Sequence, residues 1–199
     1  AAHGLVLSLT EDFVQAEQEF KRAIELNPKL FEAHYFYART CFGQGKLEQA
    51  ALLFEQASQV NPDDYQAVSL LACTFKGLQK PDEARAAYGR SIKRIRRRLE
   101  LNPDEARAYY LGAHALLELG ELGESEKWVQ RALEMEPDNP YNIYGIACYY
   151  AQLDRLDQAL DYLEKALDLG FAHKGWIKND SDLDPLRDHP RFQALVRQL

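Results

Sequence analysis

A repeat of 34 residues is the feature that most limits how this 199-residue chain can fold. Four prolines, each preceded by Asn or Glu, lie 34, 41 and 34 residues apart, at Pro28, Pro62, Pro103 and Pro137. Small residues keep the same register in three series, which are Gly4, Ala38, Ala72, Ala113 and Ala147; Ala16, Ala50, Ala84, Ser125 and Ala159; and Ala23, Ala57, Ser91, Ala132 and Ala166. Large apolar residues follow the second series by four positions, at Phe20, Phe54, Tyr88, Val129 and Leu163. A shared register over five units indicates an array of structural repeats.

Each repeat contains two stretches with apolar residues at helical spacing, separated by a short turn such as Gly43-Gln44-Gly45. The second stretch ends near the proline, which cannot continue a helix. Small residues at fixed positions let helices approach closely, and the large residues fill the remaining space. A single helix pair cannot bury its apolar face, so the pairs must stack. The sequence therefore predicts an all-α solenoid.

This pattern resembles the tetratricopeptide repeat family, whose unit is also a helix–turn–helix of about 34 residues. The clearest copy runs from Phe31 to Pro62, where the small–aromatic–small signature is complete. The fourth copy departs most, with Ser125 and Val129 where alanine and an aromatic residue are usual. The resemblance implies a right-handed α-solenoid of five repeats over residues 1–171, followed by a C-terminal cap at residues 172–199.

The third repeat is longer than the others. Ser91 is still in register but Pro103 arrives seven residues late, so seven residues are inserted between them. Seven residues are close to two helical turns, which nearly preserves the direction in which a helix faces. One apolar stripe continues through the insertion, formed by Tyr88, Ile92, Ile95 and Leu99. We therefore expect a lengthened helix in this repeat.

The first repeat lacks the start of its first helix, because the chain begins at Ala1 without a methionine. We interpret the sequence as a piece cut from a longer protein, whose function is shared with an N-terminal part. The alternative is processing of a complete short protein. The mass of the native gene product distinguishes the two interpretations.

The 34-residue period ends after Phe171. A final helix is expected after Asp188, with an apolar face formed by Phe192, Leu195, Val196 and Leu199. A solenoid needs an end unit that covers the core of its last repeat, and this segment suits that role. Residues 179–195 also resemble the end-of-group unit that closes tetratricopeptide arrays in many bacterial signalling and regulatory proteins.

Composition narrows the classes of function. The net charge of −7 and the pI of about 5.3 argue against a dedicated nucleic-acid-binding protein. No apolar run approaches the roughly 18 residues of a membrane-spanning helix. Cys41, Cys73 and Cys148 leave one cysteine unpaired under any disulfide scheme, which favours a reducing, cytoplasmic location.

No motif for catalysis or for metal binding stands out. The five histidines are scattered and lie near no nucleophile elbow, zinc motif or phosphate-binding glycine loop. Alternating carboxylates from Asp180 to Asp184 begin like a calcium loop, but Pro185 stands where that loop needs glycine. We therefore expect a protein that is not an enzyme and that holds neither a cofactor nor a metal.

Positive charge is concentrated in one segment of the lengthened helix. Six basic residues occur within nine positions with no acidic residue among them: Arg90, Lys93, Arg94, Arg96, Arg97 and Arg98. They spread over the face opposite the apolar stripe, as on an ordinary solvated helix. The functional alternative is a second docking site for an acidic segment or phosphates, carried by Arg90, Lys93, Arg94, Arg97 and Arg98.

The family resemblance places the first helix of each repeat along a concave groove. By helical spacing, the predicted groove residues are Tyr35, Arg39, Arg107, Tyr110, His114, Tyr141 and Tyr144. Members of the family that bind chaperone tails use lysines and asparagines here, and that set is missing. Tyrosine with arginine suits the capture of a peptide through aromatic contacts and charge-assisted hydrogen bonds.

Two functions follow. The first is a non-catalytic module that binds a protein or peptide in the groove, with the basic helix as a further contact. The second is the regulatory half of a multidomain bacterial enzyme, such as a kinase or cyclase, or of a transcription regulator, with the output domain outside this chain. A weaker third interpretation is contact with nucleic acid through the basic helix. The sequence leaves the oligomeric state and the partner undetermined.

Overall fold

The computed structural model describes residues 1–198, so Leu199, expected on the apolar face of the last helix, lies outside the described residues. The described chain is helical and contains no strand, which confirms the all-α prediction. Five helix pairs follow one another: α1 (Ala2–Leu9) with α2 (Phe13–Leu26), α3 (Phe31–Gly43) with α4 (Leu47–Val60), α5 (Gln66–Gly77) with α6 (Pro81–Leu101), α7 (Ala106–Leu119) with α8 (Leu122–Met135), and α9 (Pro140–Gln152) with α10 (Leu156–Asp168).

Local chemistry accounts for several helix ends. The Asp12 side chain accepts a hydrogen bond from the backbone N–H of Gln15 and so caps the start of α2. Asn139 caps α9 in the same way, and Pro140 occupies the first turn, where its missing N–H costs nothing. Helix α7 ends at Gly120, whose φ of 88° is left-handed and favours glycine.

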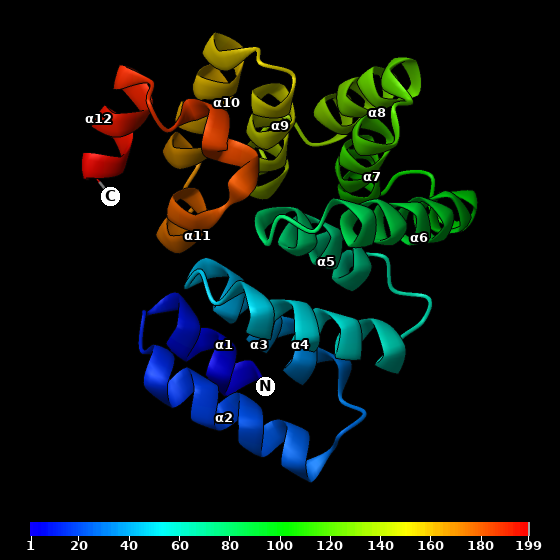
Figure 1. The fold of residues 1–199 in the computed structure, drawn as a ribbon, viewed down its shortest axis with the longest axis vertical. Coiled ribbons are helices and arrows are strands. Elements are labelled where there is room, and N and C mark those ends of the chain that lie inside the picture. Colours follow the sequence, from blue (N-terminus) through cyan, green and yellow to red (C-terminus); the bar gives the residue numbers. More distant parts are fainter. Residues whose placement is uncertain (199) are drawn as a thin grey trace.

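The pairs stack because each second helix also packs against the first helix of the next pair. Helix α2 contacts α3, α4 contacts α5, and α6 contacts α7. The first helices contact one another as well, where α5 meets α7 and α7 meets α9. Figure 1 shows the resulting curved stack, from α1 and α2 to α9 and α10.

The repeated small residues fill the places where helices approach most closely. All of them are buried except Ala23, which is half-buried near the outer end of α2. The two serines in these series keep their hydroxyls hydrogen-bonded. The Ser91 hydroxyl lies 2.6 Å from the Ser69 hydroxyl, and Ser125 donates to the carbonyl of Ala113 at 2.7 Å. Serine therefore replaces alanine here without leaving a buried polar group unpaired.

Helix α6 has 21 residues, whereas the corresponding helices α4 and α8 have 14. Its extended end buries Ile95 against Tyr65, Ala108 and Leu111. The Tyr65 hydroxyl donates to Glu105, which ties the turn before α5 to the turn before α7. The insertion thus continues the helix and extends the core with it.

Three short elements follow the last pair. They are α11 (Lys174–Asn179), a 3₁₀ helix η1 (Ser181–Leu186) and α12 (Pro190–Gln198). Ile177, Leu183 and Leu186 are fully buried in the same apolar cluster as α9 and α10. These residues cover the end of the stack. The Arg191 side chain fastens α12 to α10 through ion pairs with Asp161 and Glu164.

Candidate functional site

The candidate site is a hollow on the concave side of the stack. It is lined by residues from four first helices, α3, α5, α7 and α9, and by the segment after α10. Its volume is about 520 Å³, counting the space that is open to solvent. The lining is mainly aromatic and aliphatic, and only a few polar groups face it. Sites that bind ligands commonly have this character.

The structure brings most of the predicted groove residues to this hollow. Six of the seven line it directly: Arg39, Arg107, Tyr110, His114, Tyr141 and Tyr144. The seventh, Tyr35, lies next to it, because the Arg107 guanidinium donates to the Tyr35 hydroxyl at 3.1 Å. The predicted groove residues, which come from three different repeats, therefore lie together on one face.

The groove tyrosines differ in exposure. Tyr141 is 39% exposed, but Tyr35, Tyr110 and Tyr144 are buried. Neighbouring rings cover two of them: the Tyr35 ring stacks on Phe31 with centroids 5.3 Å apart, and the Tyr144 ring stacks on Phe171 with centroids 4.1 Å apart. Gly145 makes room for the Tyr110 ring, since a Cβ there would lie 2.6 Å from it. These three tyrosines support the walls of the hollow, whereas Tyr141 keeps part of its surface exposed while it contacts Phe171 and His173.

The two arginines of the hollow differ from most others in the described chain, because neither has a carboxylate within ion-pair distance. Arg39 lies over two aromatic rings, with its guanidinium carbon 5.1 Å from the centre of the Trp176 ring and 5.7 Å from that of Tyr35. Arg107 has only its bond to Tyr35, and its Nε is buried without a hydrogen-bond partner. A buried guanidinium without an anion is costly.

Two buried carboxylates at the hollow were missed as site residues by the sequence analysis. The Asp180 carboxylate accepts a hydrogen bond from the Tyr144 hydroxyl at 2.9 Å and one from the backbone N–H of Asp182 at 3.0 Å. The Asp182 carboxylate lies 3.1 Å from the Lys76 ammonium and 3.8 Å from the His114 ring. The alternating spacing of these aspartates resembles the start of a calcium loop, and that local pattern does not indicate burial beside Lys76 and His114.

Burial shifts the pKa values of several groups at the hollow. Loss of hydration raises the pKa of Asp180 to about 7, despite its hydrogen bonds. Burial also opposes the charge of Lys76, but Asp182 and Glu118 outweigh it and raise the pKa of Lys76. Burial holds the pKa of the Cys73 and Cys148 thiols well above the usual range, so both stay protonated.

The C-terminal segment reaches farther than the expected cap over the last repeat. Helix α11 packs against α3 of the second pair, and η1 packs against both α5 and α9 (Figure 1). The Asn179 amide donates to the carbonyl of Gly43, 136 residues away, at 2.9 Å. The reason is the curvature of the stack, which brings the inner helices of distant repeats within reach of one short segment.

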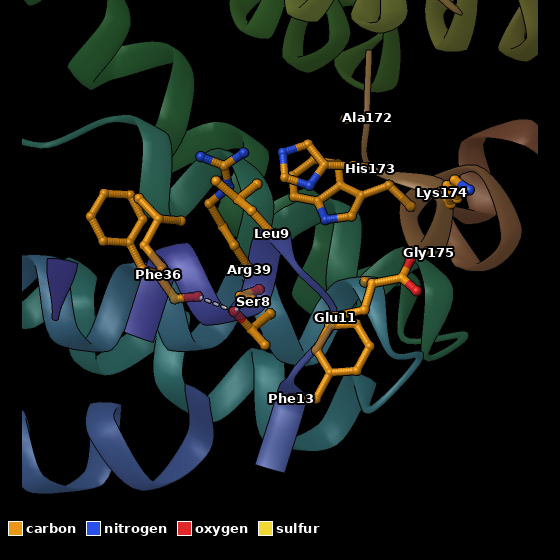
Figure 2. A pocket seen from close by; sticks show the side chains of 14 residues that line it. Ser8, Leu9, Glu11, Phe13, Phe36, Arg39, Ala172, His173, Lys174 and Gly175 are labelled. Carbon is orange, nitrogen blue, oxygen red and sulfur yellow. Dashed lines mark hydrogen bonds between the residues drawn. The ribbon is translucent and has the colours of Figure 1, made fainter. Parts of the chain in front are cut away.

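A second cleft opens where this segment meets the first two pairs. Figure 2 shows Ser8 and Leu9 of α1 and Arg39 of α3 facing His173 and Lys174. Burial, and the nearby charge of Arg39, lower the pKa of His173 to about 4, so its ring is neutral near pH 7. Arg39 lines both this cleft and the hollow.

The basic residues of α6 are largely engaged within the chain. Arg90 pairs with Glu55, Arg97 with Asp63 and Arg98 with Glu105, and Arg96 contacts Glu121 and Glu124. Arg94 donates to the Ser58 hydroxyl and to the carbonyl of Asp64. Lys93 is exposed. These contacts favour the solvated-face interpretation, because a docking partner would have to displace carboxylates already in place.

Substitutions in α6 test this interpretation. Arg94→Gln removes two hydrogen bonds from a half-buried position, so we expect it to lower the free energy of unfolding by about 1 kcal/mol. Arg97→Gln removes one exposed ion pair and should leave stability unchanged. Urea denaturation measures both. Equal stability of the two variants would contradict the structural role of Arg94.

The comparisons with known proteins agree with this architecture. Stacked antiparallel helix pairs with a concave face define an α-solenoid repeat protein. Three family models, each described as Tetratricopeptide repeat, match residues 9–73, 69–140 and 142–170. The chain therefore belongs to the tetratricopeptide repeat family. No curated protein sequence matches the chain.

Solved structures with low sequence identity share the fold. A thermophilic tetratricopeptide-repeat protein of Thermus thermophilus, TTC0263, is 22% identical with a TM-score of 0.60, over 92% of this chain and 98% of that one. YrrB, described as having an unusual peptide-binding site, is 19% identical with a TM-score of 0.50, over 98% and 89% of the two chains. MamA is 19% identical with a TM-score of 0.50, over 83% and 93%.

No helix in residues 1–198 is both long and apolar enough to span a membrane. Within the same range, no three His, Cys, Asp or Glu side chains are grouped so that they could hold a metal ion.

Proposed function

We propose that this chain is a non-catalytic module that binds a peptide segment or a partner domain on its concave face. One observation carries the proposal: Arg39 and Arg107 face a common hollow and have no carboxylate partner in the described chain. The surrounding walls are aromatic, and Tyr141 offers an exposed ring at the edge. Aromatic and arginine side chains are the residues that dominate binding energy at protein interfaces.

Further observations support the same function. YrrB, which shares the fold, is described as having a peptide-binding site, and the family is used for protein interaction. Burial holds the pKa of the two thiols of the hollow well above the usual range, so both are protonated, which disfavours a nucleophilic role. We propose no cofactor for the same site. Three free cysteines suit a reducing compartment, which we take to be the cytoplasm.

The alternative function is the regulatory half of a multidomain signalling protein. The resemblance of residues 179–195 to an end-of-group unit favours it. In that case the concave face binds either the protein's own output domain or a signalling partner. Sequencing of the full open reading frame distinguishes this alternative, because it shows whether a kinase, a cyclase or a DNA-binding domain is present.

The groove proposal is tested by changing its exposed residues. We expect the variant with Arg39→Ala and Tyr141→Ala to lose proteins that the wild type captures from an extract of the source organism. Binding of an identified partner should weaken at least tenfold, because a charged contact and an aromatic contact are both lost. Capture is read by mass spectrometry and affinity by calorimetry.

A matched control carries substitutions of the same kind on the other side of the stack. Arg22→Ala with Leu52→Ala removes one arginine and one exposed apolar side chain from α2 and α4, far from the hollow. The control should capture the wild-type set of proteins. If the groove variant captures that set as well, the concave face is not the binding surface.

A further inference from the structure

The segment that crosses the concave face lies where a partner would bind. Its helix α11 rests on α3, and η1 rests on α5 and α9, which are three of the helices that line the hollow. Trp176, Asp180 and Asp182 of this segment themselves line the hollow. The chain therefore fills part of its own groove with an aromatic ring and two carboxylates.

The N-terminal half of this segment is held mainly by the packing of Trp176 and Ile177 and by the hydrogen bonds of Asn179. Besides the bond from Asn179 to Gly43, the Trp176 ring lies edge-on to Phe42, with centroids 5.1 Å apart, and beneath the Arg39 guanidinium. Helix α11 has six residues and no side-chain cap, so it has little stability of its own. Only Ile177 of α11 is fully buried.

The C-terminal half shows what kind of group the groove accepts. The Asp182 carboxylate is held by Lys76, and the Gln152 amide donates to the Asp182 carbonyl at 2.7 Å. The groove thus binds a carboxylate of the segment with the Lys76 ammonium and binds a backbone carbonyl of the segment with the Gln152 side-chain amide. Both are contacts that a peptide from another protein can make equally well.

Two cations of the groove receive no carboxylate from the segment. Arg39 and Arg107 have no carboxylate partner in the described chain, although the sequence as a whole carries an excess of acidic residues. An occupant with more carboxylates than residues 174–182 would therefore satisfy the groove better than the chain's own segment does. The occupant would also need an aromatic ring to replace Trp176 on Arg39.

We propose that residues 174–182 occupy the part of the groove in which an acidic partner peptide binds. The partner peptide carries a large aromatic side chain, and its binding displaces α11 from α3. This inference rests on the proposed function and names the partner's chemistry and the regulation of the site. In the free protein the segment lowers the affinity of the groove. When the partner binds, its aromatic ring takes the position of Trp176, and its carboxylates pair with Arg39 and Arg107.

The test uses two capped, fluorescently labelled peptides and a variant that releases α11. The first peptide has the sequence of residues 171–187, and the second has glutamate in place of Lys174 and Lys178. Gly175→Ala puts a Cβ 2.2 Å from the Gly43 carbonyl oxygen, and because that atom is backbone, we expect α11 to move away from α3. Lys178→Ala is the matched control, because that side chain is exposed on the same helix.

We expect Gly175→Ala to bind both peptides at least tenfold tighter than the wild type and Lys178→Ala do, as measured by fluorescence anisotropy. The glutamate peptide should bind Gly175→Ala more tightly than the first peptide does, and this difference should vanish when Arg39 and Arg107 are both glutamine. Circular dichroism shows whether each variant is folded. If Gly175→Ala does not fold, Asn179→Ala, which removes the hydrogen bonds from the Asn179 amide to the carbonyls of Gly43 and Gly175, should still give about a threefold gain.

Equal affinities of Gly175→Ala and Lys178→Ala, or equal binding of a scrambled peptide, would overturn the proposal. So would a glutamate peptide that binds no better than the first peptide. These results leave the groove proposal standing if Arg39→Ala with Tyr141→Ala still loses captured partners. Conversely, if the variant with Arg39→Ala and Tyr141→Ala captures the same proteins as the wild type, the proposed function itself is wrong, whatever the peptide measurements show.

Discussion

Gly112→Ala should destabilise the protein by about 2–3 kcal/mol and lower its melting temperature by roughly 5–10 °C. A Cβ at this position of α7 would lie 2.2 Å from Cζ3 and 2.5 Å from Cε3 of Trp128. The indole cannot move freely, since it packs against all three apolar clusters and lies edge-on to Tyr109. Relief of the clash must therefore shift α8 away from α7. Thermal and urea denaturation followed by circular dichroism measure the effect.

Gly89→Ala is the matched control. Gly89 lies inside α6, and a Cβ there meets no atom within 4 Å. Alanine in an open helical position restricts the unfolded chain more than glycine does, so this variant should be more stable by about 0.5–1 kcal/mol. A Gly112→Ala protein as stable as the wild type would mean that Trp128 does not pack against Gly112.

The second large effect concerns Asp180 and pH. Burial raises its pKa in the folded protein to about 7, whereas the ordinary value for an aspartate is near 4. Between these two values the folded state holds a proton that the unfolded state has lost. The stabilisation from neutral Asp180 is therefore complete below about pH 4 and is lost as the pH rises to 7, with a cost of the order of 3–4 kcal/mol above that.

Asp180→Asn isolates this effect from those of neighbouring groups. The groups facing Asp180 are Tyr144, Cys148, Asp182 and Lys76, and all four are present in both proteins. We expect the variant to gain stability over the wild type as the pH rises from 4 to 8. Denaturation at five or more pH values gives the difference directly. A difference that stays constant with pH would show that Asp180 is ionised throughout.

Periodicity explains what the sequence alone could establish. The repeated small residues indicate contacts within a repeat and between neighbouring repeats. The two residues of such a contact lie less than about 40 positions apart in the sequence. The groove residues followed for the same reason, since each first helix presents the same face. The tail's contact with α3 joins Asn179 to Gly43, and no local pattern predicts a pairing over that distance.

The bond between Asn179 and Gly43 has a consequence for cooperativity. Repeat arrays with nearest-neighbour contacts alone can fray from either terminus one unit at a time. Here the segment after the last helix pair also touches the second pair, so melting of one end removes contacts at the other. Hydrogen exchange in α3 and in α11 should then report a shared opening event, and the two ends of the array should unfold as a coupled unit.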